Sequence, residues 1–227
     1  MRVLAIDTAL AVCAVAILDT EQGGVLARQS VPMARGHAEA LMPLLAQVMD
    51  ASGLDFAGLD RIAVTTGPGS FTGLRVGIAA ARGIALAASK PSIGLSTLAA
   101  YAAPLIAQDD SIPVVVAIDA RHDHVYLQIF GPGGRSLVPP RAVPIHEAVR
   151  AANVGPVRIV GSAASLIAAA WPSTGLPPAS VETTAAPEID WVARLGAAAA
   201  ANLAPPTPLY LRPADAQPQD ASRLARR

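Results

Sequence analysis

The chain has few charged residues, few aromatic residues and one cysteine. Charged residues make up 15% of its 227 residues, aromatic residues make up 4%, and the formal net charge is zero. A domain that binds nucleic acid through many phosphate contacts is usually basic, so this balance disfavours strong direct binding of RNA or DNA. The single Cys13 excludes an internal disulfide and fits a reducing compartment. It falls in a predicted buried strand, where its thiol should be unreactive.

Long apolar runs are also lacking. Residues 3–18 resemble the apolar part of a signal peptide, but Asp7 and Thr8 interrupt them, and the pattern favours two buried strands. Arg82 interrupts the best candidate for a membrane span, so no apolar stretch reaches the ~18 residues that a span needs. We therefore expect a cytoplasmic protein that does not contact a membrane.

Apolar residues make up 52% of the chain, enough for a sizeable core. In the first half, hydrophobic periodicity and turn residues predict strands at 2–8, 12–19, 24–31, 61–66 and 92–94 and helices at 37–52 and 72–88. In the second half they predict strands at 114–120, 125–130 and 157–160 and helices at 96–107, 162–170 and 188–203. Prolines are frequent there, so its elements should be short and its loops long. The first half therefore has a β-β-β-α-β-α order that the second half partly repeats.

The most distinctive stretch is a glycine-rich run between the strand at 61–66 and the helix at 72–88. It reads Gly67-Pro68-Gly69-Ser70-Phe71-Thr72-Gly73-Leu74-Arg75. A glycine-rich turn at the start of a helix can direct its backbone N–H groups at a phosphate. It can also serve chiefly as a tight connection from strand to helix. The degraded state of the other phosphate-binding motifs, described below, favours the second interpretation.

Six segments together resemble the TsaB family, also called YeaZ, of bacterial tRNA-modification subunits. Besides the glycine-rich run, they are Leu4-Ala5-Ile6-Asp7-Thr8, His37-Ala38-Glu39-Ala40-Leu41-Met42-Pro43, Ile118-Asp119-Ala120-Arg121, Val125-Tyr126 and Tyr210-Leu211-Arg212-Pro213. They extend from the first predicted strand to near the C-terminus, and the glycine-rich run is the most specific of them.

The resemblance implies an α/β fold of the actin, sugar-kinase and heat-shock-protein ATPase superfamily, which is ribonuclease H-like. Such a fold has two halves of the β-β-β-α-β-α type, and here the second half is reduced. We expect residues 1–100 to form the N-terminal subdomain that carries the dimer interface. Residues 101–213 should form the reduced C-terminal subdomain, and residues 214–227 a flexible tail.

The resemblance also implies a function. TsaB-type proteins support formation of threonylcarbamoyladenosine (t6A) at adenosine 37 of tRNAs that read ANN codons. They form a heterodimer with the catalytic subunit TsaD, form a homodimer in isolation, and act together with the ATPase TsaE. The chain should therefore be a noncatalytic subunit without a cofactor of its own. Any ATP or ADP should bind at the interface of the complex, and tRNA should be contacted only through the complex.

A catalytic relative would bind a metal through two histidines spaced His-x-x-x-His on the first long helix. His37 occupies the first of these positions, but Leu41 occupies the second. One imidazole does not hold a metal without further ligands, so we expect no metal site.

Asp7, Thr8 and Asp119 are the remaining candidates for nucleotide binding, because the superfamily holds phosphates and their metal at turns in these places. Asp119 is followed by Ala120 and Arg121 rather than by a glycine turn, which disfavours a close approach of the backbone to a phosphate. The last third of the chain has no Gly-Gly pair to seat a base. Asp7 and Asp119 therefore either cap turns or keep a residual contact with nucleotide or magnesium.

Two other groups of residues suggest chemistry without completing it. His122, Asp123 and His124 form a polar cluster, but no third metal ligand stands at a recognisable spacing, and we interpret the cluster as a solvated hairpin turn. Ser70 and Ser96 do not lie in a Gly-x-Ser-x-Gly sequence, so hydrolysis by a serine nucleophile has no support.

Two predicted helices offer surfaces for a partner. In the helix at 72–88, small residues recur at every fourth position and allow close approach of another helix: Gly73, Gly77, Ala81 and Ala85. The helix at 37–52 has one apolar face, formed by Leu41, Leu44, Leu45, Val48 and Met49. Either set can pack inside the monomer instead. Because TsaB-type proteins pair through these helices, we predict that both sets line the interface. A bulky charge at Gly77 or Leu45 should then abolish association and leave the chain folded.

Two alternative functions stay open. The chain could be a homodimeric nucleotide-binding protein that uses Asp7 and Thr8. It could also be a degenerate relative of the glycoprotease-like metallopeptidases. An independent enzyme of either the transferase or the peptidase kind needs the second histidine, a glycine-bearing phosphate turn and a base-binding turn, and the sequence has none of these.

Overall fold

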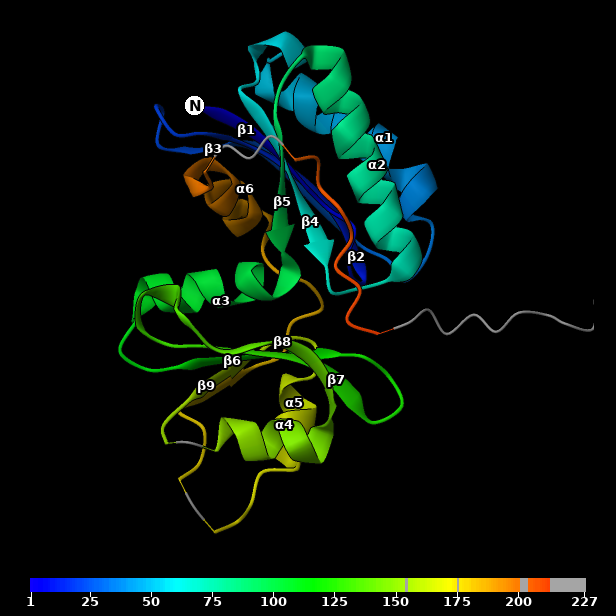
Figure 1. The fold of residues 1–227 in the computed structure, drawn as a ribbon. Helices are drawn as coiled ribbons and strands as arrows, with labels where there is room; N and C mark the ends of the chain where they lie inside the picture. The colour runs from blue at the N-terminus through cyan, green and yellow to red at the C-terminus, as the bar shows by residue number, and fades with distance from the viewer. Residues whose placement is uncertain (154, 175, 201–203, 213–227) are drawn as a thin grey trace, which may run out of the picture.

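The computed structural model describes residues 1–153, 155–174, 176–200 and 204–212, and it consists of two lobes, each built on one five-stranded sheet (Figure 1). The first sheet has the order β3-β2-β1-β4-β5. Its strands are β1 (Arg2–Asp7), β2 (Val12–Asp19), β3 (Gly24–Pro32), β4 (Arg61–Gly67) and β5 (Ser92–Ser96). β1 pairs with β2 in the antiparallel sense and with β4 in the parallel sense. The expectation of two buried strands within residues 3–18 is confirmed.

Helices cover both faces of the first sheet, which explains why every residue of β2 is buried. α1 (His37–Ser52) and α2 (Phe71–Ala88) lie on one face and share a core with β1, β2 and β4. α6 (Ile189–Ala198) lies on the other face and packs against alternate residues of β1 and β2. This alternation follows from the period of two in a strand.

The second sheet has the order β10-β9-β6-β7-β8. Its strands are β6 (Val114–Asp119), β7 (His124–Phe130), β8 (Ser136–Pro144), β9 (Arg158–Val160) and β10 (Ser180–Glu182). α4 (Ile145–Ala152) and α5 (Ala164–Ala169) cover one face, and α3 (Thr97–Gln108) covers the other. Two short 3₁₀ helices, Phe56–Gly58 and Pro132–Gly134, complete the described elements.

The second half repeats the order of the first in full, and most of its elements are shorter. Three antiparallel strands, a helix, a strand, a helix and a strand follow one another in both halves, and the two strand orders correspond position by position. α4 has 8 residues where α1 has 16, and α5 has 6 where α2 has 18. The predicted β-β-β-α-β-α repeat is thus confirmed, and the reduction concerns the length of the elements.

The two halves exchange their last helices, and this corrects the predicted domain boundary. α3 follows β5 of the first sheet but packs on β6 of the second, whereas α6 follows β10 but packs on the first sheet. The predicted boundary between residues 100 and 101 falls inside α3. Residues 189–198, which were assigned to the C-terminal subdomain, belong to the core of the first lobe. The predicted tail at 214–227 lies outside the described residues.

α2 corrects the expectation about membrane spans. This helix is 18 residues long and apolar enough to cross a membrane by length and composition alone, with one third of that window buried. Arg82 therefore does not exclude it on those criteria. In the fold it packs along β4 as one of the two helices on that face of the sheet, as core helices of the same composition do (Figure 1).

Candidate functional site

The glycine-rich run forms the connection between β4 and α2, and it is hydrogen-bonded to the turn that follows β1. The N–H of Ser70 donates to the carbonyl oxygen of Ala9 at 2.7 Å, and the hydroxyl of Thr8 donates to the carbonyl oxygen of Gly73 at 2.7 Å. The Ser70 side chain caps α2 by accepting from the N–H of Gly73 at 3.3 Å. An N–H that a phosphate cradle would offer to a ligand is therefore used within the chain.

Three glycines of this region allow the β1–β2 turn to approach α2 closely. A Cβ added to Gly69 would lie 2.3 Å from the Ala9 carbonyl oxygen, and one added to Gly73 would lie 2.1 Å from the Thr8 carbonyl oxygen. A Cβ on Gly77 would lie 2.4 Å from the Thr8 hydroxyl. Only glycine fits at such distances. The run thus acts as a tight strand-to-helix connection, and its helical glycines face Thr8 rather than a partner.

Asp7 is fully buried at the end of β1, beside this connection. Its Oδ1 accepts the N–H of Ala9 at 2.9 Å and the hydroxyl of Thr65 at 2.5 Å. Its Oδ2 has no hydrogen-bond partner within the described part of the chain. Burial raises the pKa of this carboxyl above its ordinary value, and the hydrogen bonds from Thr65 and Ala9 oppose that rise. Asp7 and Thr8 therefore stabilise the turn through hydrogen bonds. Of the two Asp7 oxygens, Oδ2 makes no hydrogen bond with the described residues.

Asp119 holds the corresponding position at the end of β6, but it is exposed. Its Oδ1 accepts the N–H of Arg121 at 2.8 Å, so it caps the β6–β7 turn. Three consecutive residues of this turn have positive φ: Arg121, His122 and Asp123. Arg212 donates to the Ala120 carbonyl oxygen at 3.0 Å and holds the turn from outside. Asp7 and Asp119 are thus equivalent in the two halves but differ in environment, and for Asp119 the structure shows the role of a turn cap.

The residues that the sequence suggested for metal binding or nucleophilic chemistry lie in the core or cap helices. His37 is buried, and its Nε2 donates to the Leu10 carbonyl oxygen at 2.9 Å, since a carbonyl can only accept. Leu41 fills the core one turn later. No group of three His, Cys, Asp or Glu side chains suited to a metal occurs among the residues that the structure describes. Ser96 caps α3. Cys13 is buried as predicted, which raises the pKa of its thiol to about 11.

The C-terminal strap, residues 204–212, runs from the first lobe to the second, and no pattern in the sequence predicts its contacts. Leu209 donates its N–H to the Thr66 carbonyl oxygen at 2.8 Å. The Tyr210 hydroxyl accepts from Nε of Arg75 at 3.1 Å, and the Arg75 guanidinium lies 3.6 Å above the ring of Phe71. Two segments that were separate motifs in the sequence therefore meet in space. The contact between Arg75 and Tyr210 could not be predicted from the sequence, because the two residues are 135 positions apart.

Comparison with known proteins decides the family. Residues 12–160 match the family TsaD, tRNA N6-adenosine threonylcarbamoyltransferase. The chain is also 40% identical over 126 residues to the tRNA threonylcarbamoyladenosine biosynthesis protein TsaB of Escherichia coli. This match covers 56% of this chain and 53% of that protein. The chain belongs to the TsaD family.

Solved structures agree with this assignment. YeaZ from Pseudomonas aeruginosa has a TM-score of 0.78 and 26% identity, and the match covers 92% of this chain and 99% of that one. An inorganic polyphosphate/ATP-glucomannokinase from an Arthrobacter strain shares the fold alone. Its TM-score is 0.52 and its identity is 12%, and the match covers 87% of this chain and 98% of that one. The predicted fold class is confirmed. The chain spans about half the length of the TsaB proteins of Escherichia coli and Haemophilus influenzae, which it covers to 53% and 52%.

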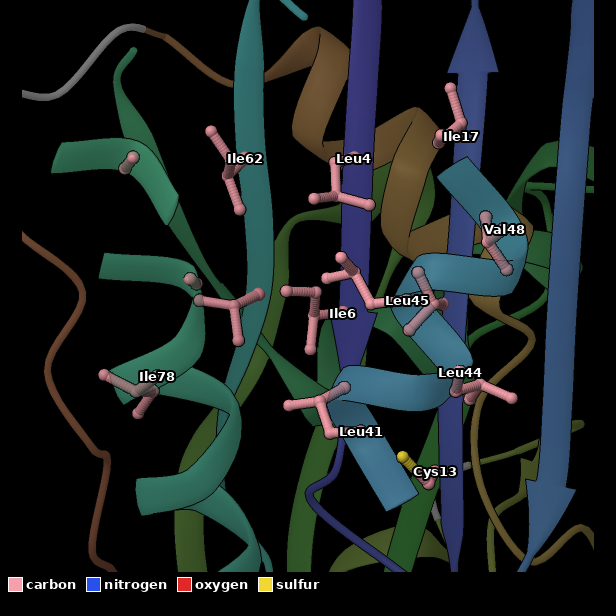
Figure 2. Close-up of a cluster of buried hydrophobic side chains, with 14 of the residues drawn as sticks. Leu4, Ile6, Cys13, Ile17, Leu41, Leu44, Leu45, Val48, Ile62 and Ile78 are labelled. Carbon is pink, nitrogen blue, oxygen red and sulfur yellow. The ribbon is translucent and has the colours of Figure 1, made fainter. Parts of the chain in front are cut away.

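The residues predicted to line a partner interface lie in the core of the chain instead. Figure 2 shows Leu41, Leu44, Leu45 and Val48 of α1 directed at the strands of the first sheet. All four are at most 6% exposed, and Met49 is 5% exposed. Gly73, Gly77, Ala81 and Ala85 are also buried, on the face of α2 that meets the sheet. The assignment of these residues to the partner surface is therefore wrong, because the same spacing that fits a partner helix also fits the sheet.

The opposite faces of α1 and α2 are exposed and largely apolar or small. On α2, Leu86 is 83% exposed, Ala79 and Ala87 are exposed, and a Cβ on Gly83 would have no neighbour within 4 Å. On α1, Met42 is 53% exposed. Since the two helices lie side by side on one face of the sheet, these residues belong to the outer surface of the first lobe (Figure 1). We call it the α1–α2 outer face.

Charges placed in the core should unfold the chain rather than abolish association of a folded one. We expect Leu45→Asp and Gly77→Asp each to lower the free energy of unfolding by about 3–5 kcal/mol, because each buries an unpaired carboxylate and Gly77 also lacks room for a Cβ. Gln47→Asp on the exposed side of α1 is the matched control and should change stability by less than about 0.5 kcal/mol. Urea unfolding of the isolated chain measures both. A folded Leu45→Asp chain of unchanged stability would contradict the core placement.

The raised pKa of Asp7 makes the ionised carboxyl destabilising. A carboxyl whose pKa is higher in the folded than in the unfolded chain binds more protons when folded, so stability falls as the pH rises above the unfolded value near 3.8. Asp7→Asn removes this dependence. We expect its free energy of unfolding, relative to that of the unmodified chain, to increase between pH 4 and pH 7. Asp50→Asn, which removes an exposed carboxylate of α1, is the control. A relative stability that does not change with pH would exclude this role for Asp7.

Proposed function

We propose that this chain is a noncatalytic subunit of the machinery that forms t6A at adenosine 37 of tRNAs reading ANN codons. In this proposal it pairs with TsaD through the α1–α2 outer face and, together with TsaE, supports transfer of the threonylcarbamoyl group by TsaD. Relatives named as TsaB biosynthesis proteins support the role in t6A formation. The matches to these relatives cover about half of their length, so the partners and the reaction step are part of the proposal.

The observation that carries the pairing is the exposure of the α1–α2 outer face. A large aliphatic side chain that is 83% exposed, as Leu86 is, stands among alanines and a glycine on a helix of which only one third is buried. Contiguous exposed apolar surface of this kind marks interaction sites. Arg82 is exposed beside it and offers a fork-shaped donor to a carboxylate on a partner. A helical surface of TsaD with apolar residues and peripheral carboxylates is the complement that we infer.

Three contacts support the noncatalytic role. Leu41 occupies the core where a second metal-binding histidine would stand. The N–H of Ser70 donates to Ala9 instead of to a phosphate, and the Asp119 turn is closed by Arg121 and Arg212. In this proposal the chain has no cofactor of its own, because these contacts occupy the places where a nucleotide would bind. ATP or ADP binds at the interface with TsaD, and tRNA is contacted only through the complex. The homodimer formed in isolation uses the same outer face, and the protein acts in the cytoplasm.

A charge on the outer face should separate the partners without unfolding the chain. We expect Leu86→Glu to weaken association with purified TsaD at least about tenfold, since it places a charge in an apolar contact. Leu166→Glu alters a leucine that is 43% exposed on α5 of the other lobe and should leave the affinity unchanged. Analytical ultracentrifugation of mixtures with TsaD gives both affinities, and circular dichroism verifies the fold. Equal affinities for the two variants would place the interface elsewhere.

Reconstitution tests the function itself. We expect t6A formation on tRNA by TsaD and TsaE to depend on this chain, and Leu86→Glu to lower the rate in proportion to the loss of complex. Raising the concentration of the variant should restore the rate, because the substitution affects pairing alone. Undiminished product without the chain would refute the noncatalytic-subunit function. Activity of the chain without TsaD would favour an independent enzyme.

A further inference from the structure

A hollow of about 840 Å³ lies in the second lobe, away from the glycine-rich connection. The β6–β7 turn, the start of α4 and the end of α5 surround it, in the part of Figure 1 where α4 and α5 lie together. His122, His124, His146 and Arg150 line one part of it, and Ile145 and Val149 are among its apolar walls. We call it the histidine hollow. Its volume is within the range of small-molecule sites.

The chain has four histidines, and three of them line this hollow. His122 and His124 come from the turn that the sequence suggested was simply solvated. His146 comes from α4, an element that the sequence analysis did not predict. Arg150 follows His146 by four residues, so the two side chains lie on the same side of α4. Residues from two segments thus converge on a single concave surface.

The side chains are free to bind a ligand. Nδ1 of His124 lies 2.6 Å from the His122 carbonyl oxygen and donates to it, which directs Nε2 away from that bond. For the side chains of His122, His146 and Arg150, no hydrogen bond or ion pair is formed with any residue that the structure describes. Glu147, next to His146, is instead paired with Arg141 at 3.8 Å. Among the residues that the structure describes, the side chains of His122, His146 and Arg150 are therefore available to donate to a ligand.

These donors suit a phosphate better than a metal. A guanidinium cannot ligate a cation, but it donates in a fork that matches phosphate oxygens, and imidazole N–H groups add to it. The three histidines do not form a cluster that could hold a metal in the described part of the chain. Apolar walls beside the donors suit a base or a similar flat group. Asp123 also lines the hollow, and its carboxylate opposes an anion.

We propose that the histidine hollow binds the phosphate of a nucleotide-sized phosphate ester, with Arg150, His122 and His146 as donors and the apolar wall beside the base. The free nucleotide and a nucleotide within an RNA strand share this chemistry. The proposal does not rest on pairing with TsaD, because the hollow is complete within one chain.

Calorimetric titration of the full chain with AMP, adenosine and inorganic phosphate tests it. We expect AMP to bind and adenosine to bind at least about tenfold more weakly, since it lacks the phosphate. His146→Ala and Arg150→Ala should each weaken AMP binding at least about tenfold. Arg135→Ala, which removes an exposed guanidinium of the same lobe outside the hollow, should have no effect. No heat with AMP at millimolar concentration, or equal affinities for all three variants, would overturn the proposal.

Asp123→Asn gives a test of opposite sign. Asn tolerates the positive φ of this position, 56°, so the turn should keep its shape while one repelling charge is lost. We expect AMP to bind more tightly to this variant, and weaker binding would contradict the arrangement. A short oligoadenylate distinguishes the two sources of the phosphate. If the oligoadenylate displaces AMP and binds with an affinity equal to that of AMP, the hollow is assigned to a nucleotide within an RNA strand. If the oligoadenylate does not displace AMP, the hollow is assigned to a free nucleotide.

Discussion

The close approach of α2 to the β1–β2 turn is the contact on which the first lobe depends. The backbone of Thr8 and Ala9 occupies the space that side chains at positions 69 and 73 would need, and the Thr8 hydroxyl occupies the space at position 77. Glycine at all three positions makes the contact possible. The contact fixes α2 along β4, places Ser70 over Ala9, and encloses Asp7. A loop that resembles a phosphate cradle in sequence is thereby occupied by the chain's own backbone. The position of the outer surface of α2 follows from the same contact.

The two lobes are held together by exchanged elements rather than by a flat interface. α3 and α6 each leave one half, pack on the sheet of the other and contact each other. The C-terminal strap adds a second connection, with Leu209 bonded to Thr66 in one lobe and Arg212 bonded to the β6–β7 turn in the other. The hydroxyl of Tyr101 in α3 also donates to the Thr184 carbonyl oxygen. A cut of the chain near residue 100 would therefore separate each sheet from a helix that covers it.

Much of the fold could be predicted from the sequence, because periodicity reports which positions are buried. The first half follows the predicted order with boundaries that differ by a few residues. The second half was harder. β8 contains Pro139 and Pro140, which argue against a strand, but it lies at the edge of its sheet, where a missing N–H is tolerated. α4 follows directly on its last proline, Pro144, and was missed. Contacts between distant segments, such as Arg75 with Tyr210, leave no local pattern.

The error about the partner surface shows what periodicity leaves undetermined. A stripe of small or apolar residues every fourth position reports that one face of a helix is in close contact, but it does not say with what. For Gly73 and Gly77 the contact is Thr8 of the same chain, and for Leu45 it is the first sheet. Once those faces are accounted for, the surface open to a partner must be the one without strong periodicity, where Leu86 and Met42 stand among small residues. Exposure in the folded chain therefore shows which helix faces are open to solvent, and the hydrophobic pattern conceals these faces because it is dominated by the core.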